Sequence, residues 1–331
     1  MEKRQFGRTG LQISVLSFGC GAVGGLMTKG EPRDQERAVA RALELGMNYF
    51  DTASSYGDGA SEINTGRIFA KLKPNAYLGT KVRLTEQQYG GIAAAVAASM
   101  DASLKRLGRD SVDVFHLHNR ITEKTGGDAL DYRLVLDEVM PAMEKLRQQG
   151  KTRFIGITAL GETGPLVKVI ESNAFDTAQV CFNALNPSAG AAIPANYPAQ
   201  DYDRLLERAQ KAGVGTIGIR VLAGGALSGS EARHPLATQD VAPIGSAQNF
   251  SGDVARTRRL EPMIKEGHVS SFVELAMRFA ISNPALSTTL VGLATLDQFE
   301  ESAAAVLKGP LSPAASKRLA ELQAGFAGEA R

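Results

Sequence analysis

Tryptophan is absent from this chain of 331 residues, and cysteine and histidine are scarce, with two and four copies. The two cysteines, Cys20 and Cys181, are too few for a disulfide framework, and neither stands at the spacing of a metal site. We therefore expect no disulfides and no resident metal. Such cysteine usage is typical of a protein that works in a reducing cytoplasm.

An excess of either charge is also missing, because 37 basic residues stand against 35 acidic ones and the net charge is +2. Lys and Arg are scattered rather than gathered into basic blocks, so nucleic acid is not an expected partner. No apolar run approaches the roughly 18 residues of a membrane span, and the N-terminus lacks the apolar segment of a signal peptide. We expect a soluble, unprocessed protein that binds small molecules and no membrane.

What the chain does contain is a regular alternation of short apolar strands and amphipathic helices. One helix is predicted from Asp34, as its N-cap, to a stop at Gly46, and another over residues 92–108. Strands that alternate with helices pair in parallel. Eight strands are predicted, at residues 15–20, 48–53, 77–82, 112–118, 153–158, 177–182, 214–220 and 288–293.

Eight such units predict an α/β fold with a single (β/α)₈ TIM barrel, in which residues 1–331 form one domain. Residues 4–14 predict an N-terminal β-hairpin that closes the bottom of the barrel. Long rim loops are predicted at 119–133, 183–199 and 224–251, where they would shape a substrate pocket. Functional residues are expected at the C-terminal ends of the strands.

A competing interpretation comes from Gly19, Gly21 and Gly24, which follow a strand with the G-x-G-x-x-G spacing of a Rossmann fold. That fingerprint needs a helix to open at the third glycine. The segment "LMTKGEP" intervenes instead, and the helix is predicted to begin near Asp34. We therefore favour a glycine-rich loop that passes close to a ligand.

Polar residues stand at the ends of three consecutive predicted strands, namely Asp51, Lys81 and His118, and Tyr56 follows Asp51 in a turn. A buried carboxylate costs several kcal/mol unless it is paired, and Lys81 is the cation that can compensate Asp51. A nearby ammonium also lowers the pKa of a tyrosine, which makes Tyr56 a usable general acid. His118 can polarise the same carbonyl oxygen.

These residues lie within "FGRTGLQIS", "MNYFDTASSYGDGASE", "GTK", "SVDVFHLHN" and "AMRFAISNPALSTTLVGLATLDQFEES", and with these motifs the chain resembles a bacterial-type member of the aldo-keto reductase superfamily. The resemblance covers nearly the whole chain. It implies a monomeric barrel that binds a nicotinamide cofactor without a Rossmann domain. It also implies NAD(P)H-dependent reduction of aldehydes and ketones, or oxidation of the corresponding alcohols or aldoses. The implied catalytic residues are Asp51, Tyr56, Lys81 and His118.

The pair "HLH" offers two imidazoles, and the resemblance chooses between them. The family pattern places the catalytic histidine five residues beyond the aspartate of its strand, here Asp113, which selects His118. We interpret His116 as a buried structural residue. His234 and His268 are expected on the solvated surface.

The cofactor contacts implied by the resemblance depart from the family pattern at several positions. Thr158 and Ala159 replace a Ser-Asn pair that holds the nicotinamide amide, although a glutamine, Gln179, is present. Gly292 and Gln298 stand where a basic pair often grips a 2′-phosphate. NADP(H) is the expected cofactor, with NAD(H) as a second one. The implied contacts are Gly21, Ala22, Thr158, Gln179, Arg220, Leu222, Gly224, Gly292, Gln298 and Ser302.

Arg220 follows Ile219 where many members stack an aromatic ring on the nicotinamide, and it can instead add charge beside a pyrophosphate. Its structural alternative is an ion pair at the barrel rim. A wider alternative is a redox-inactive barrel that keeps only the cofactor pocket, because fold does not guarantee chemistry.

The absence of tryptophan limits the substrate pocket as well, because any aromatic wall must then come from other rings. The candidates for that wall are Tyr89, Tyr132, Tyr197 and Phe250. Such a pocket favours small or polar carbonyls, including sugars, over large flat ones.

Overall fold

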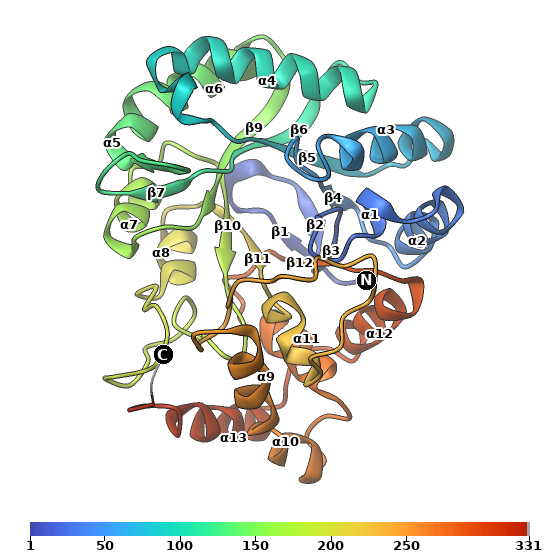
Figure 1. Cartoon of the computed structure of the whole chain (residues 1–331), viewed down its shortest axis with the longest axis vertical. Coiled ribbons are helices and arrows are strands. Elements are labelled where there is room, and N and C mark those ends of the chain that lie inside the picture. Colours follow the sequence, from blue (N-terminus) through green and yellow to red (C-terminus); the bar gives the residue numbers. More distant parts are fainter. Residues whose placement is uncertain (330–331) are drawn as a thin grey trace.

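A closed barrel of eight parallel strands lies at the centre of the computed structural model, which describes residues 1–329 (Figure 1). Each strand pairs with the next one along the chain in the barrel, and the last pairs with the first. All eight predicted strands are present, so the predicted (β/α)₈ barrel is confirmed. The barrel strands are β3 Leu16–Gly19, β4 Tyr49–Asp51, β5 Tyr77–Val82, β6 Val112–Leu117, β9 Thr152–Ala159, β10 Thr177–Cys181, β11 Gly215–Ile219 and β12 Thr288–Gly292.

Side chains alternate between the barrel interior and the surrounding helices, as the period of two along a strand requires. On β4, Phe50 points outward and meets Phe69 of α3 edge to face, with 5.1 Å between the ring centroids. Its neighbour Tyr49 points inward and packs in a small cluster with Val114 and Ile217. The residues that flank Phe50 therefore face the inside of the barrel, and Asp51 is one of them.

Helices surround the strands, with α4 packed on α6 and α2 packed on α3 (Figure 1). Helix α4, Ile92–Leu107, ends at Gly108 as predicted. Helix α2, Pro32–Glu44, begins earlier than predicted, because Pro32 is preset for a first helical turn, so Asp34 is not the N-cap. The other helices are α1 Leu26–Lys29, α3 Ala60–Leu72, α5 Tyr132–Leu134, α6 Met140–Gln148, α7 Thr163–Glu171, α8 Leu205–Lys211, α9 Phe250–Arg258, α10 Pro262–Lys265, α11 Phe272–Ile281, α12 Leu296–Leu307 and α13 Pro313–Ala324. Short 3₁₀ or π turns are η1 Gly7–Thr9, η2 Glu86–Gly91, η3 Val135–Val139 and η4 Ala223–Ser228.

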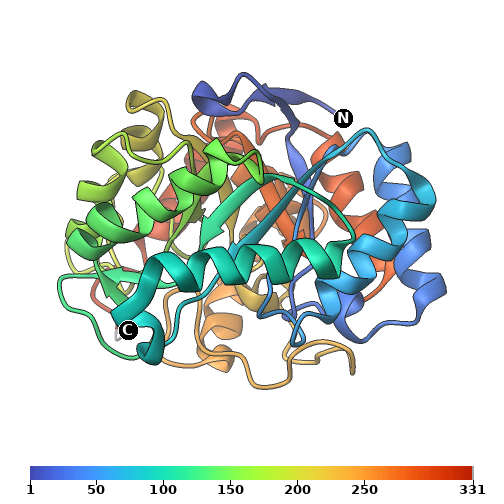
Figure 2. The same cartoon turned by 90° about the horizontal axis from the view of Figure 1, so that it is seen from above.

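The predicted N-terminal hairpin is present as β1 Lys3–Gln5 and β2 Gln12–Ser14, which pair antiparallel. Phe6 in its turn is fully buried at the barrel bottom, and a Cβ on Gly215 would come within 2.5 Å of its ring. The absence of a side chain at Gly215, at the start of β11, therefore leaves room for the Phe6 ring at the barrel bottom. Figure 2 shows the hairpin at one end of the barrel and the loop around residues 230–250 at the other.

The rim loops carry more structure than the sequence predicts. Residues 119–133 contain a small two-stranded sheet, β7 Arg120–Thr122 and β8 Ala129–Asp131. Three-residue strands are too short to produce a recognisable period. The loop at 224–251 opens with η4 and ends where α9 begins, at Phe250.

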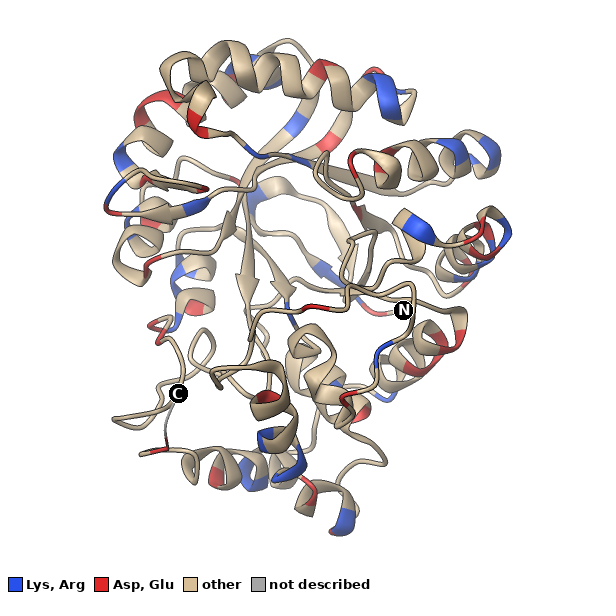
Figure 3. Cartoon of the chain, viewed as in Figure 1, with Lys and Arg blue, Asp and Glu red and all other residues tan. Residues whose placement is uncertain are grey.

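Figure 3 shows Lys and Arg interspersed with Asp and Glu along the helices that surround the barrel. Within residues 1–329, no helix is long and apolar enough to cross a membrane. The described residues also contain no group of three or more His, Cys, Asp or Glu side chains that could hold a metal ion.

Candidate active site

The ends of β4 and β5 bring a buried ion pair together inside the barrel. Asp51 lies opposite Gly79 in the parallel register, so Lys81, two residues further on, faces the same interior. The Lys81 ammonium donates to the Asp51 carboxylate, to the Thr52 carbonyl at 2.8 Å and to the Tyr56 hydroxyl at 3.2 Å. All three ammonium donors are thus used, and neither charged side chain is more than 1% exposed.

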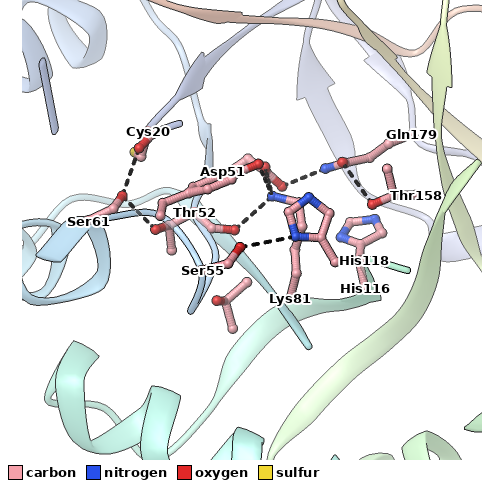
Figure 4. A network of polar contacts seen from close by, with 12 residues as sticks. Cys20, Asp51, Thr52, Ser55, Ser61, Lys81, His116, His118, Thr158 and Gln179 are labelled. Atoms are coloured by element: carbon pink, nitrogen blue, oxygen red, sulfur yellow. Dashed lines mark hydrogen bonds and ion pairs between the residues drawn. The ribbon is translucent and has the colours of Figure 1, made fainter. Parts of the chain in front are cut away.

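The second oxygen of the Asp51 carboxylate accepts from Gln179 Nε2 at 2.8 Å (Figure 4). It also accepts from the Tyr49 hydroxyl at 3.3 Å. The Thr158 hydroxyl in turn donates to Gln179 Oε1 at 3.3 Å. Burial raises the pKa of the Asp51 carboxyl, and the donors around it oppose that shift. Burial would lower the pKa of Lys81, but Asp51 and Tyr56 outweigh it, so the net pKa is raised and Lys81 stays charged.

Tyr56 lies in the turn after β4, with its hydroxyl on the Lys81 ammonium and its ring edge-on to His118. The two ring centroids are 5.6 Å apart, and the planes make an angle of 84°. Burial raises the pKa of the Tyr56 hydroxyl above its ordinary value, and the Lys81 charge pulls it back down. Lys81 therefore lowers the pKa of Tyr56, as predicted, but burial outweighs it and the net pKa is raised. The phenol holds its proton throughout the neutral range.

His118 follows the end of β6, where its backbone N–H donates to the Val82 carbonyl at 2.7 Å. Its Nδ1 lies 3.4 Å from the Ser55 hydroxyl. Burial, together with the positive charges of Lys81, Arg83 and Arg220, lowers the pKa of His118 to about 3. The ring is thus neutral, and a neutral imidazole donates from one nitrogen only.

The low pKa of His118 predicts how activity should respond to acid. A histidine with a lowered pKa takes up a proton only near pH 3, so its neutral form persists through the ordinary histidine range. We expect kcat/KM for carbonyl reduction to show no inflection near pH 6.5, which is the usual pKa of this side chain. A pH profile of the wild type and of His118→Gln tests this expectation. An acid limb near pH 6.5 that vanishes in the variant would contradict it.

His116, two residues before His118, is fully buried, as expected for a structural residue. Its Nε2 lies 3.0 Å from the Thr177 hydroxyl, and its Nδ1 has no hydrogen-bond partner. Burial and the charge of Lys81 lower the pKa of His116 well below its ordinary value. His268 is half-buried, and its Nε2 lies 3.5 Å from a carboxylate oxygen of Glu266.

A cavity of about 460 Å³ opens above the ion pair at the C-terminal end of the barrel. Asp51, Tyr56 and His118 line its floor, whereas Lys81 lies beneath the surface. Nine of the ten predicted cofactor contacts also line this cavity, and they are Gly21, Thr158, Gln179, Arg220, Leu222, Gly224, Gly292, Gln298 and Ser302.

The tenth predicted contact, Ala22, stays a prediction. It is not among the residues that line the cavity, and its carbonyl accepts from the Thr238 hydroxyl at 2.9 Å. Thr238 also donates its backbone N–H to the Val23 carbonyl at 3.2 Å. The loop after η4 is therefore hydrogen-bonded to the backbone of Ala22 and Val23, a long-range contact that no local pattern indicates.

Gly21 and Gly24, which belong to the G-x-G-x-x-G pattern, have different surroundings in this barrel. A Cβ on Gly24 would come within 2.3 Å of the Leu293 backbone nitrogen, so a glycine is required for the close approach of two rim loops. Gly21 faces the Tyr56 ring, and a Cβ there would lie 3.7 Å from it. A one-turn helix, α1, does open soon after Gly24, which the sequence does not predict.

Gln298 and Arg220 have surroundings that the sequence does not indicate. Gln298 lies in the first turn of α12, and its Oε1 accepts from the Ala294 backbone N–H at 3.0 Å. Arg220 is exposed at the end of β11, in the left-handed region with φ of 59°. Among residues 1–329, no carboxylate pairs with Arg220, so the predicted alternative of a rim ion pair is wrong.

Three of the four candidate wall aromatics lie away from the cavity. Phe250 is the one that lines it. Tyr197 is buried and donates to the Leu185 carbonyl at 2.9 Å, Tyr89 donates to Gly127, and Tyr132 contacts Lys168. Other lining residues were not predicted, namely Glu301 of α12 and Arg233 and His234 of the loop after η4.

An eight-stranded barrel whose strand ends join a buried Asp–Lys pair, a tyrosine and a neutral histidine beside a cavity defines a barrel oxidoreductase. Comparison with known proteins agrees. The family model described as the Aldo/keto reductase family matches residues 15–324. The chain therefore belongs to the aldo/keto reductase family, and it is an NAD(P)H-dependent oxidoreductase that reduces aldehydes and ketones or runs the reverse oxidation.

Several characterised proteins are similar over most of their length. L-galactose dehydrogenase of Arabidopsis thaliana is 30% identical over 314 residues, which cover 92% of this chain and 88% of that protein. L-glyceraldehyde 3-phosphate reductase of Escherichia coli K12 is 26% identical over 332 residues, with coverages of 92% and 88%. The holo form of an aldo-keto reductase from Bacillus halodurans, 24% identical, shares the fold with a TM-score of 0.72 and coverages of 97% and 96%.

Proposed function

We propose that Asp51, Tyr56, Lys81 and His118 act together as the catalytic group, with Tyr56 as the proton donor for carbonyl reduction. The observation that carries this proposal is the buried Lys81 ammonium, which touches both the Asp51 carboxylate and the Tyr56 hydroxyl. Asp51, in turn held by Gln179 at 2.8 Å, orients the ammonium. An acid, its tuning cation and an orienting anion thus share one hydrogen-bonded chain.

Each residue then has a distinct task at the carbonyl oxygen. The nicotinamide, when bound, supplies or accepts the hydride. Tyr56 gives its proton to the oxygen during reduction, and Lys81 limits how far burial raises the pKa of the phenol. His118, neutral and beside Tyr56, donates a hydrogen bond to the same oxygen as charge develops on it.

The cavity suits a nicotinamide dinucleotide in the chemistry of its walls. Gly21, Gly224 and Gly292 expose backbone rather than side chains to it, and Gly21 keeps the space over the Tyr56 ring open. Arg220 adds a positive charge without a carboxylate partner among the described residues. Thr158 and Gln179 would hold the carboxamide, and Gln298 and Ser302 would face the adenosine.

We further propose that both NADPH and NADH serve as cofactors, with a reduced preference for NADPH. Among the described residues that line the cavity, none from β12 or α12 is basic, and Glu301 brings a carboxylate to this end. A 2′-phosphate there would lack the charge-assisted hydrogen bond that an arginine supplies, worth roughly 1.5–3 kcal/mol.

Gln298→Arg should therefore raise the ratio of kcat/KM for NADPH to that for NADH about tenfold or more. The substitution also removes the hydrogen bond from the Ala294 N–H, so Gln298→Ala is the matched control, since it loses the same bond without adding a charge. Steady-state kinetics of both variants with both cofactors is the test. A strictly NADPH-specific wild type, with a cofactor preference that Gln298→Arg leaves unchanged, would contradict the proposal.

For the substrate, we propose small hydroxylated aldehydes and aldoses. A second hollow, of about 440 Å³, adjoins the catalytic group through Ser55, which is also in contact with His118. Seven of its nine lining residues have polar or charged side chains, and the full set is Ser54, Ser55, Arg83, Leu84, Thr85, Glu86, Gln87, Gly127 and Asp128. Hydroxyl groups find partners on such walls, whereas large flat rings do not. The names of the two curated relatives, which refer to a sugar and to a triose phosphate, agree with this class.

A panel of aldoses, glyceraldehyde and aromatic aldehydes, followed by nicotinamide absorbance with both cofactors, tests the substrate class. Higher kcat/KM for the hydroxylated compounds supports it, and a clear preference for aromatic aldehydes would refute it. The alternative, a redox-inactive barrel that only holds the cofactor, predicts cofactor binding without turnover on the whole panel. We also propose that residues 1–331 act as one domain and as a monomer, which light scattering can check.

A further inference from the structure

A hollow of about 350 Å³ lies next to the catalytic cavity, and parts of the segments 186–202 and 243–248 line it together with Arg220. Arg220 and Ile244 belong to the walls of both spaces, so the two spaces adjoin. Among the described residues that line this Arg220 hollow, Arg220 alone carries a charged side chain. The proposed catalytic chemistry does not use this space.

The wall at residues 244–247 is fixed by a buried carboxylate. Asp253 is fully buried, and its two oxygens accept from the backbone N–H groups of all four residues, at 2.7–3.2 Å. The hydroxyl of Ser246 also accepts from Arg256 Nη1 at 2.7 Å. A Cβ on Gly245 would come within 2.8 Å of the Asp253 carboxylate, so this position requires a glycine. The hollow is therefore preformed, as is usual for a small-molecule site.

The amides on the wall at 186–202 are used within the protein. Asn186 accepts from the Ser188 hydroxyl at 2.7 Å and donates to the Gln200 carbonyl at 2.9 Å. The Gln200 side chain donates from Nε2 to the Gly161 carbonyl at 2.8 Å. The Arg220 guanidinium, in contrast, pairs with no carboxylate among residues 1–329. It is the group of this hollow that is left to bind a ligand.

The charge of Arg220 acts on the reacting centre. It adds to burial and to the charge of Lys81 in lowering the pKa of His118. It also opposes the rise that burial imposes on the pKa of the Cys181 thiol, at the end of β10. Because the effect of a charge falls off with distance, the guanidinium lies near His118. Since it lines the hollow as well, it stands at the junction of the two spaces.

The hollow beside Ser55 has the opposite balance of charge. Its one cation, Arg83, pairs with Asp128 at 2.8 Å, and Glu86 adds a second carboxylate to the same walls. An anion is repelled by two carboxylates against one guanidinium, whereas it is attracted by a guanidinium without a carboxylate. Of the two hollows next to the catalytic group, the Arg220 hollow is therefore the one that suits an anion.

We propose that the Arg220 hollow binds an anionic group of the aldehyde substrate, a carboxylate or a phosphate, and that Arg220 determines this specificity. A guanidinium presents a planar fork of N–H donors that matches the oxygens of either group. A substrate that lies across the junction places its carbonyl at the catalytic group and its anion on the guanidinium. The inference rests on the proposed reduction of small aldehydes and adds a charged group to that class.

Steady-state kinetics with two matched pairs of aldehydes tests the assignment. The pairs are glyceraldehyde 3-phosphate with glyceraldehyde, and succinic semialdehyde with butanal. We expect the wild type to have the higher kcat/KM for the anionic member of at least one pair, which also tells a phosphate from a carboxylate. Arg220→Gln should lower that preference about tenfold or more, mainly through KM, because the contact is made before as well as during hydride transfer. Arg220→Lys, which keeps a charge but loses the fork, should fall between the two.

Arg83→Gln is the matched control, because it also removes a guanidinium whose charge acts on His118, but from the hollow beside Ser55. It should keep most of the preference for the anion. A wild type without that preference, or a folded Arg220→Gln that retains it, would overturn the proposal. An Arg220→Gln whose one defect is a raised cofactor KM, shared by charged and neutral aldehydes, would also overturn it and assign Arg220 to the cofactor.

Equilibrium binding separates this proposal from the catalytic one. Calorimetric titration of the cofactor-loaded chain with glycerol 3-phosphate and with glycerol needs no turnover. We expect the wild type to bind the phosphate more tightly, and Arg220→Gln to lose that difference. A wild type that shows this difference but reduces no aldehyde would refute the catalytic proposal alone. Equal binding by the wild type and Arg220→Gln, in an enzyme that does reduce aldehydes, would refute the anion site alone.

Discussion

Tyr56→Phe is expected to lower kcat for aldehyde reduction by a factor on the order of 10² to 10⁴, while the Kd of the cofactor changes little. The variant keeps the ring that lies edge-on to His118 and removes only the hydroxyl on the Lys81 ammonium. Without that hydroxyl, Tyr56 has no proton to donate to the carbonyl oxygen. The loss should therefore appear in kcat and in kcat/KM alike.

Stopped-flow and steady-state kinetics with a small aldose and NADPH provide the measurement. Tyr132→Phe is a matched control, because Tyr132 lies against Lys168 and lines neither hollow, and it should turn over as the wild type does. Near wild-type turnover in Tyr56→Phe would end the assignment of Tyr56 as the proton donor.

Lys81→Met is expected to lower the rate at every pH and to move the alkaline limb of the reduction profile upward. Lys81 opposes the rise that burial imposes on the pKa of Tyr56, so its removal lets that pKa rise further. A phenol with a higher pKa keeps its proton to higher pH, but gives it up less readily. An alkaline limb that stays in place would show that Tyr56 is tuned by another group.

The same variant should also be less stable, because it leaves the Asp51 carboxylate buried without its ammonium. Asp51→Asn should be milder in activity, since Lys81 and Tyr56 both remain and only an orienting contact is loosened. The double variant Asp51→Asn/Lys81→Met removes the stranded charge. It should recover part of the lost thermal stability and none of the lost activity, and recovered activity would contradict the role given to Lys81.

The barrel could be predicted from the sequence because its signal is periodic and repeated. Each apolar strand such as residues 77–82 is followed by an amphipathic helix, and parallel pairing follows from that order. The convergence of the site residues could be predicted from the same strand order. Asp51, Lys81 and His118 end or nearly end three neighbouring strands, so the closed barrel brings them together in the structure.

What could not be predicted depends on contacts between segments far apart in sequence. The carbonyl of Ala22 accepts a hydrogen bond from Thr238, more than 200 residues away, and Arg233 lines the cavity from a loop without periodicity. The pKa of Tyr56 is a balance of burial against one charge, and burial is known only once the barrel is built. Gln298 matches a cofactor position, yet its Oε1 already accepts a hydrogen bond from the Ala294 N–H, just before α12.

The most direct test of the account is the fate of the hydride. NADPH carrying deuterium at the transferable C4 position, mixed with the wild type and glyceraldehyde, should give an alcohol that carries one deuterium on the former carbonyl carbon, as read by mass spectrometry. Tyr56→Phe should yield the same labelled product at least about a hundredfold more slowly. Bound cofactor with no labelled alcohol from any aldehyde or aldose would contradict the account and leave a barrel that holds nicotinamide without using it.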